Sequence, residues 1–252
     1  MPHTQDILPA GRYAAVSCHV ERPLDDGVWA RFAALQASAP GGFRIAALLR
    51  PPDATAGEDE ERWLVRAREA AAHGPVGLHT HWTAPDHARP TGGNPSGLVR
   101  EQVEWMRAHL DVEIALFCGG GWYMDERVAT ALAELGLADC TATAFRPAYL
   151  PQDAPRLQVQ EPAYLELASG DRMLELPTTH SIGMLVRAVL GPLRQPLVQA
   201  YFHDTDLIDT KRRTALWLGL AILGQRRTPT DLAALQRGFV PTKTMSFANS
   251  RG

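Results

Sequence analysis

Short apolar runs alternate with stretches of helical spacing along most of the chain, and this alternation limits the fold more than any other feature. Runs such as 112–117 (VEIALF) and 197–202 (LVQAYF) are almost continuously apolar, which is typical of strands buried on both faces. Strands that alternate with helices indicate a parallel sheet covered by helices. The pattern predicts an α/β fold with strands near 12–20, 43–49, 75–81, 112–117, 137–142, 172–176 and 197–202, and helices near 28–36, 59–72, 97–110, 125–135, 210–224 and 231–237.

Length and composition narrow the class of protein. The 252 residues suffice for one large α/β domain, and we expect a single domain over 1–252. The net charge of −3 argues against a nucleic-acid partner, which would need a basic face. The most apolar run, 215–223, is shorter than the roughly 18 residues of a membrane span, so no membrane-spanning helix is expected. The N-terminus lacks a signal-peptide pattern. The three cysteines, Cys18, Cys118 and Cys140, are widely spaced and are expected to be reduced thiols. Together these features predict a cytoplasmic protein.

Residues with chemical potential lie where the predicted strands end. His79 and His81 follow one apolar run, and side chains two apart on a strand point to the same face, so both can reach one ion. Similar residues end other strands: His19 and Glu21, the segment 118–122, His180 and His203. Active sites of barrels and of doubly wound sheets both lie at this edge. The glycine-rich dinucleotide signature is missing, so we favour a barrel, distorted or incomplete because about seven strands are expected.

The order of these residues resembles that of the polysaccharide deacetylases, a NodB-homology family with an irregular (β/α)7 barrel. In that family the first strand ends in acidic residues, the third in a histidine motif, the fourth in an Arg-Pro-Pro-like turn before an LxxxG helix, and a late strand in an apolar-apolar-His motif. The resemblance covers about residues 12–224, and its matching segments are 16–21 (VSCHVE), 77–81 (GLHTH), 117–122 (FCGGGW), 132–136 (LAELG), 174–177 (LELP) and 200–204 (AYFHD).

The resemblance implies a role for each matching residue. Glu21, His79 and His81 would bind a divalent metal ion: zinc first, with cobalt, nickel, manganese or iron as alternatives. His203 would be the general acid, with Asp204 or Asp206 orienting its ring.

The chain departs from the family at three positions. His19 stands where the general-base aspartate is expected, and it is either a replacement base, a fourth ligand or a hydrogen-bonded structural residue. Thr83 stands where the second metal histidine normally lies, so His81 is the substitute. Cys118 replaces the arginine of the fourth-strand turn.

Aromatic residues near these strand ends are candidates for substrate binding. Trp82, Trp122 and Tyr123 could stack on the face of a sugar, although aromatic residues are also ordinary core residues. His180 is a further candidate at the barrel mouth. The loop 83–96, rich in Pro, Gly and Asn, is long enough to indicate function.

These features predict a metal-dependent hydrolase that removes an acetyl group from an N-acetylated sugar or a related small or carrier-linked amide. Its partner would be a small-molecule or glycan substrate. One alternative is an inactive barrel that acts as a carbohydrate-binding or regulatory protein, favoured by His19 and Cys118 in place of the acidic base and its arginine. The other is a hydrolase of a different non-peptide C–N bond.

Overall fold

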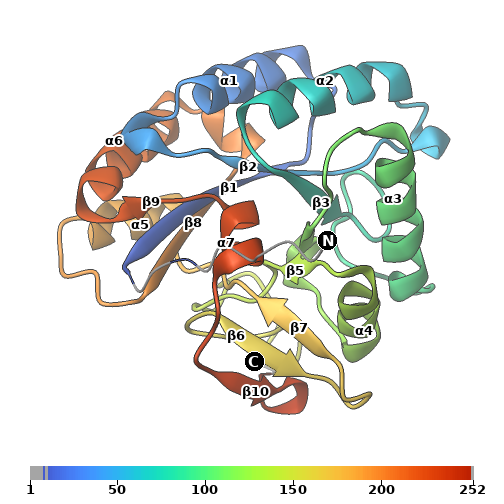
Figure 1. The fold of residues 1–252 in the computed structure, drawn as a ribbon. Helices are drawn as coiled ribbons and strands as arrows, with labels where there is room; N and C mark the ends of the chain where they lie inside the picture. Colours follow the sequence, from blue (N-terminus) through green and yellow to red (C-terminus); the bar gives the residue numbers. More distant parts are fainter. Residues whose placement is uncertain (1–7, 9–10, 251–252) are drawn as a thin grey trace, which may run out of the picture.

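A mostly parallel sheet forms the centre of the molecule in the computed structural model, which describes residue 8 and residues 11–250 (Figure 1). Within this described part the sheet has ten strands: β1 Tyr13–Val20, β2 Ala46–Leu49, β3 Val76–Thr80, β4 Leu116–Gly119, β5 Ala138–Asp139, β6 Ala163–Glu166, β7 Arg172–Glu175, β8 Leu197–His203, β9 Thr228–Pro229 and β10 Thr244–Ser246.

Helices surround this sheet and follow most of its strands. The α-helices are α1 Asp26–Ala37, α2 Glu60–His73, α3 Pro95–His109, α4 Glu126–Leu135, α5 Ile182–Ala188, α6 Thr210–Arg226 and α7 Leu232–Gly238. Short 3-10 turns are η1 Pro40–Gly42, η2 Ala54–Ala56, η3 Gly120–Trp122, η4 Asp204–Leu207 and η5 Phe247–Ser250. The six predicted helices are confirmed, and each begins after an Asp or Asn whose side chain accepts a backbone N–H bond, as an N-cap does.

The strand order explains how distant residues meet at one edge. Strands β8, β1, β2, β3, β4 and β5 are neighbours in that order and run parallel, so the late strand β8 returns beside β1. Beyond β5 the sheet continues through β7, β6 and β10, and β6 pairs with β7 antiparallel. The named strands do not close into a ring, although bridges from Thr178 to Thr143 and from His180 to Ala200 link β5 to β8. The prediction of an α/β, distorted and incomplete barrel is confirmed.

Apolar residues fill both faces of the sheet, which is why its strands are continuous apolar runs. Ala14, Val16 and Cys18 of β1 point to the helices, while Tyr13 and Ala15 point inward. At the amino-terminal end the interior also holds Leu232 and Leu235 of α7, which lies over the sheet centre in Figure 1. The other end of the interior is therefore the one left for polar side chains.

Some elements differ from the prediction in length. The expected strand 137–142 is regular only over Ala138–Asp139, because β7 pairs with β5 at a single position. The segment 145–169, which lies outside the predicted strands and helices, contains β6, and α5 was not predicted. The three cysteines are free and buried. Among the described residues, no helix combines the length and the apolar content that crossing a membrane requires.

Candidate active site

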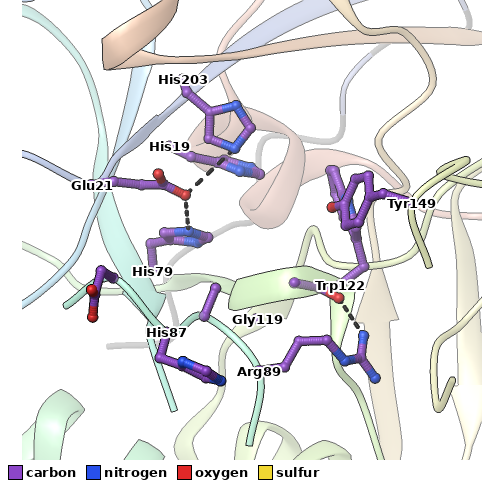
Figure 2. Close-up of a pocket in the computed structure, with 12 residues that line it drawn as sticks. His19, Glu21, His79, His87, Arg89, Gly119, Trp122, Tyr149 and His203 are labelled. Atoms are coloured by element: carbon purple, nitrogen blue, oxygen red, sulfur yellow. Dashed lines mark hydrogen bonds and ion pairs between the residues drawn. The ribbon is translucent and has the colours of Figure 1, made fainter. Parts of the chain in front are cut away.

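Five side chains converge where β1, β3 and β8 end. His19 and His203 occupy paired positions of β1 and β8, and Glu21 follows β1 directly. One carboxylate oxygen of Glu21, Oε1, lies 3.6 Å from Nε2 of His79 and 3.4 Å from Nε2 of His81. Nε2 of His203 is 3.5 Å from the same oxygen. Figure 2 shows the Glu21 carboxylate between the rings of His203 and His79.

Hydrogen bonds fix the orientation of two histidine rings and leave one nitrogen of each free. His79 Nδ1 donates to the carbonyl of Cys118 at 3.0 Å, and His81 Nδ1 donates to the carbonyl of Pro85 at 2.7 Å. This assigns the proton to Nδ1, so Nε2 carries a lone pair. Both Nε2 atoms are buried and have no hydrogen-bond partner. A carbonyl that holds the outer nitrogen is the usual support of a metal-bound histidine.

The donor atoms of Glu21, His79 and His81 fit a metal ion. They lie within 4.8 Å of one another, and two imidazoles with one carboxylate form a common zinc site with open positions. Burial would raise the pKa of Glu21, but the facing imidazoles of His79, His81 and His203 lower it well below its usual range. Glu21 is therefore a carboxylate, the form that binds metal.

A second set, His19, His79 and Cys118, also lies within 4.8 Å but suits a metal less well. Burial raises the pKa of Cys118 well above its usual range, so its sulfur stays protonated, whereas metals bind the thiolate. His19 stacks on His79 with ring centroids 4.5 Å apart and places Nε2 at 3.4 Å from the Cys118 sulfur. Burial lowers the pKa of His19, which is neutral.

His203 lies opposite these candidate ligands and is the histidine of the cluster whose pKa is raised. Burial would lower its pKa, but a hydrogen bond to Asp206 and the negative charges of Glu21 and Asp206 raise it above its usual value. Asp206 Oδ2 accepts from the His203 backbone N–H at 3.0 Å and lies 3.9 Å from His203 Nδ1. Asp206 also pairs with Arg212 at 2.9 Å. Asp206 is thus the carboxylate that faces the ring.

Asp204, named with Asp206 as a candidate for this role, has a different position. Its carboxylate accepts from the backbone N–H groups of Arg22 and Thr205, each at 2.8 Å, and burial raises its pKa to about 6. Arg22 follows Glu21 in the chain, so Asp204 braces the segment that carries Glu21 instead of orienting His203.

A glycine turn brings Trp122 to the site. A Cβ at Gly120 would lie 2.5 Å from the carbonyl oxygen of Thr80, so only glycine permits this approach of η3 to β3. Trp122 itself has a φ of 58°, a strained value for a residue with a side chain and one found mainly at functional sites. Its ring lies 5.4 Å from that of His19 and 4.9 Å from that of Tyr201.

A cavity of about 320 Å³ opens above the cluster. Its lining includes His19, Glu21, His79, His203 and Trp122, together with the loop 86–89 and Tyr149. Arg89 crosses Gly121 and donates to its carbonyl at 2.6 Å, which ties the loop to the turn (Figure 2). The sequence assigned no role to Tyr149, which lies in an irregular segment without a motif, whereas the length of the loop that carries Arg89 indicated function.

The other predicted substrate residues do not line this cavity. Trp82 is buried and donates to the carbonyl of Gly120 at 3.0 Å. Tyr123 packs on Trp82 at 5.2 Å and donates to Asp125 at 2.8 Å. Both therefore support the turn. His180 bonds Thr179 at 2.7 Å and bridges β8 at Ala200, below the end of that strand.

No protein-family model matches the chain, and no curated protein sequence matches it. Solved structures do. A protein from Mycobacterium smegmatis assigned as a polysaccharide deacetylase is 14% identical, with a TM-score of 0.59 over 89% of this chain and 88% of its own. A CE4 family pseudoenzyme from Bacillus anthracis is 10% identical, with a TM-score of 0.54 over 95% of this chain and 70% of its own.

A 4-alpha-glucanotransferase from Thermococcus litoralis is also similar, with 11% identity, a TM-score of 0.60 and coverage of 94% of this chain. The present chain spans 42% of its length. At these identities the likeness concerns the fold. The resemblance to the polysaccharide deacetylases is thus confirmed for the fold.

Proposed function

We propose that the protein is a metal-dependent amide hydrolase that removes an acetyl group from an N-acetylated sugar or a related small or carrier-linked amide. The observation that carries the proposal is the pair of buried, unpartnered Nε2 atoms of His79 and His81 beside the Glu21 carboxylate. Leaving two such atoms unsatisfied costs about 1–3 kcal/mol each, and a bound cation removes that cost.

Glu21, His79 and His81 would hold the ion, with zinc as the first choice for this donor set. When bound, the ion supplies a polarised carbonyl and a water of lowered pKa. Cys118 and Pro85 would keep the two imidazoles in the ligating orientation through their carbonyls. Asp204 would keep the Glu21 segment in place.

His203 would protonate the leaving nitrogen. An amide nitrogen leaves poorly without a proton, and the raised pKa of His203 keeps one on its ring. Asp206 would orient that ring and balance its charge. His19 would take the position of the base, since its neutral ring lines the cavity, although its lowered pKa makes it a weak one.

The cavity wall supports a sugar as the substrate. Trp122 and Tyr149 both line it, and the exposed ring of Tyr149 lies at its rim. Aromatic rings of this kind stack on the apolar face of a pyranose. A volume of about 320 Å³ is that of a small-ligand site and matches one sugar with its acetamido group better than a long polymer.

A second candidate function is binding without hydrolysis. It is favoured by His19, a buried neutral imidazole against the Cys118 sulfur, at the position where the deacetylases have their acidic base. One of the similar structures is a pseudoenzyme, so this fold also exists without activity in another protein. Such a protein would keep the cavity and bind acetamido sugars unchanged.

The test combines metal analysis with acetate release. The purified protein is stripped with a chelator, reloaded with Zn²⁺, Co²⁺, Ni²⁺, Mn²⁺ or Fe²⁺, and incubated with a panel of acetamido sugars. Stoichiometric metal with acetate release supports the hydrolase. Stoichiometric metal without release, combined with sugar binding in calorimetry, supports the binding protein.

Two further outcomes separate the remaining possibilities. Cleavage of other non-peptide C–N substrates without acetate release would keep the reaction class and overturn the acetyl group. Failure to bind any metal would overturn the whole proposal. His73→Ala, which changes an exposed histidine of α2, is the control for nonspecific metal binding by surface imidazoles.

A further inference from the structure

Five large apolar side chains on or beside α6 are exposed, and none of them lines the active-site cavity. Trp217 and Leu218 of α6 are each 50% exposed, and Leu190, just beyond α5, is 81% exposed. Ile208 and Ile222 are also exposed. These five residues are more than half of the large exposed apolar residues among those that the structure describes, and α6 or its immediate neighbours carry all of them. We call this surface the α6 face.

Helix α6 is apolar on two opposite sides. Leu216, Gly219, Leu220 and Leu223 are buried against the molecule. Trp217, Leu218 and Ile222 point outward, where a helix on the surface of a globular protein normally carries polar residues. The buried residues account for the packing of α6 on the molecule, and the outward residues stay 36–50% exposed.

Leu190 is held outward by a specific contact. Arg226, near the end of α6, donates to the carbonyls of Val189 and Gly191, on either side of Leu190. Helix α5 packs on α6, because a Cβ at Gly219 would meet the side chain of Leu185. The leucine is thus fixed beside α6, and Figure 1 shows α5 against that helix.

The same region is basic although the chain as a whole is acidic. Residues 187–227 contain seven Arg and Lys residues and three Asp residues, while the net charge of the chain is −3. Two of these Asp residues are engaged elsewhere: Asp209 caps α6 and Asp204 binds backbone groups. The third, Asp206, pairs with Arg212. Residues 210–230 contain no acidic residue, and exposed cations stand at both ends of α6, with Lys211 at its start and Arg226 at its end.

The charge decides between possible occupants of this face. A second copy of the chain would meet it through a twofold interface, which places the same cations against each other. An anionic surface instead complements the cations at both ends of the helix. Among anionic partners, a lipid surface fits best, because Trp and Leu on a helix flanked by Lys and Arg are typical of helices that lie in the headgroup layer.

We propose that the α6 face binds the surface of an anionic membrane, with α6 parallel to the bilayer and Trp217, Leu218 and Leu190 inserted among the headgroups. The cations at the helix ends would contact lipid phosphates. Because α6 begins shortly after His203, binding would hold the cavity mouth close to the membrane. This inference is independent of the proposed hydrolase activity.

The test is sedimentation of the full chain with large vesicles of phosphatidylcholine, with and without phosphatidylglycerol. We expect binding to the anionic vesicles only, and its loss at high salt, because salt screens exposed charges. The double variant Trp217→Ser, Leu218→Ser should bind at least about tenfold more weakly. Lys211→Gln should weaken binding about fivefold. The matched control is Val65→Ser, which removes an equally exposed apolar side chain from α2, outside this face.

Other results would overturn the proposal. Equal binding to neutral vesicles would show that charge does not select the partner, and undiminished binding of the double variant would show that another surface binds. Absence of vesicle binding together with a dimer that the double variant converts to monomer would assign the face to a second copy. Absence of vesicle binding with capture of polyaspartate by this face would assign it to an acidic protein. Circular dichroism of each variant excludes unfolding as the cause.

Discussion

Two polar clusters in this molecule shift the pKa values of their carboxyl groups in opposite directions. At the ends of β1, β3 and β8, Glu21 faces three histidines beneath a cavity, and its pKa is lowered because the effect of the facing imidazoles outweighs that of its burial. Between β5 and β7, Asp139 faces Glu175 at paired strand positions. Burial raises the pKa of both carboxyls, and the charge of Asp139 raises that of Glu175 further.

The difference separates the proposed ion site from a structural pair. Both oxygens of Glu175 and Oδ2 of Asp139 have no other donor, and a proton shared between the two carboxyls would satisfy them. The other oxygen of Asp139 accepts from the Thr141 hydroxyl at 2.5 Å, and that hydroxyl accepts from the backbone of Gly119 at 2.6 Å. The pair therefore braces the start of the glycine turn, whereas the histidine cluster opens to solvent and ligand.

Removing one imidazole from the histidine cluster around Glu21, called the open cluster below, should have the largest effect. His79→Ala deletes a ligand, and since even an outer-shell change costs about 10- to 100-fold in metal affinity or activity, we expect losses above about 100-fold in both. Elemental analysis and acetate release measure them on the same sample. His73→Ala should keep both values. A variant that lost His79 and kept full metal content would place the ion elsewhere.

His203→Ala should be the next largest change and should separate catalysis from metal binding. A positioned acid contributes about 10²- to 10⁴-fold, so kcat should fall by roughly 10² or more. The metal content and the free energy of unfolding should stay near those of the parent, because Asp206 keeps its pair with Arg212. Loss of metal would make His203 a ligand, and unchanged kcat would remove it from the mechanism.

The pair of Asp139 and Glu175, called the closed pair, should make folding stability depend on pH. The pKa of Glu175 is raised in the folded state, so its stabilising contribution is complete below the unfolded pKa of about 4.3 and is lost as pH rises through the folded pKa. Glu175→Gln has no carboxyl there, and its amide can donate to Asp139. The variant should therefore show a flatter decline of stability with rising pH.

Urea unfolding at a series of pH values measures this, and each pKa unit of separation corresponds to about 1.4 kcal/mol. Glu166→Gln, on the exposed face of β6, is the control and should follow the parent curve. Identical pH dependence in Glu175→Gln and the parent would mean that the pair does not carry the shared proton.

The sequence predicts the open cluster far better than the closed pair of Asp139 and Glu175. His19, Glu21, His79 and His203 follow apolar runs, and parallel strands must end at one edge, so their convergence follows from local pattern. The unpartnered Nε2 atoms depend on carbonyls at Cys118 and Pro85 and could not be predicted.

Other features depend on pairings that leave no local signal. Asp139 and Glu175 stand in ordinary apolar contexts, and their meeting requires the pairing of β5 with β7. Tyr149 reaches the cavity from an irregular segment rich in proline. The sequence left open whether Trp82 and Tyr123 contact substrate or pack in the core, and the two rings pack on each other beneath the glycine turn, where Trp82 is buried.

The connection between the two clusters gives the smallest and most discriminating test. Thr141→Val keeps the shape of the side chain but removes the hydroxyl that joins Asp139 to the Gly119 backbone. A buried N–H without a partner costs about 1–3 kcal/mol, so the free energy of unfolding should fall by that amount, and metal content should stay unchanged because no ligand moves. Thr141→Ser, which keeps the hydroxyl, should restore most of the loss. If the valine variant is as stable as the parent while kcat falls, the bond positions the turn for catalysis without stabilising the fold. If neither the free energy of unfolding nor kcat changes, the two clusters are independent, and the 2.6 Å bond does not brace the turn.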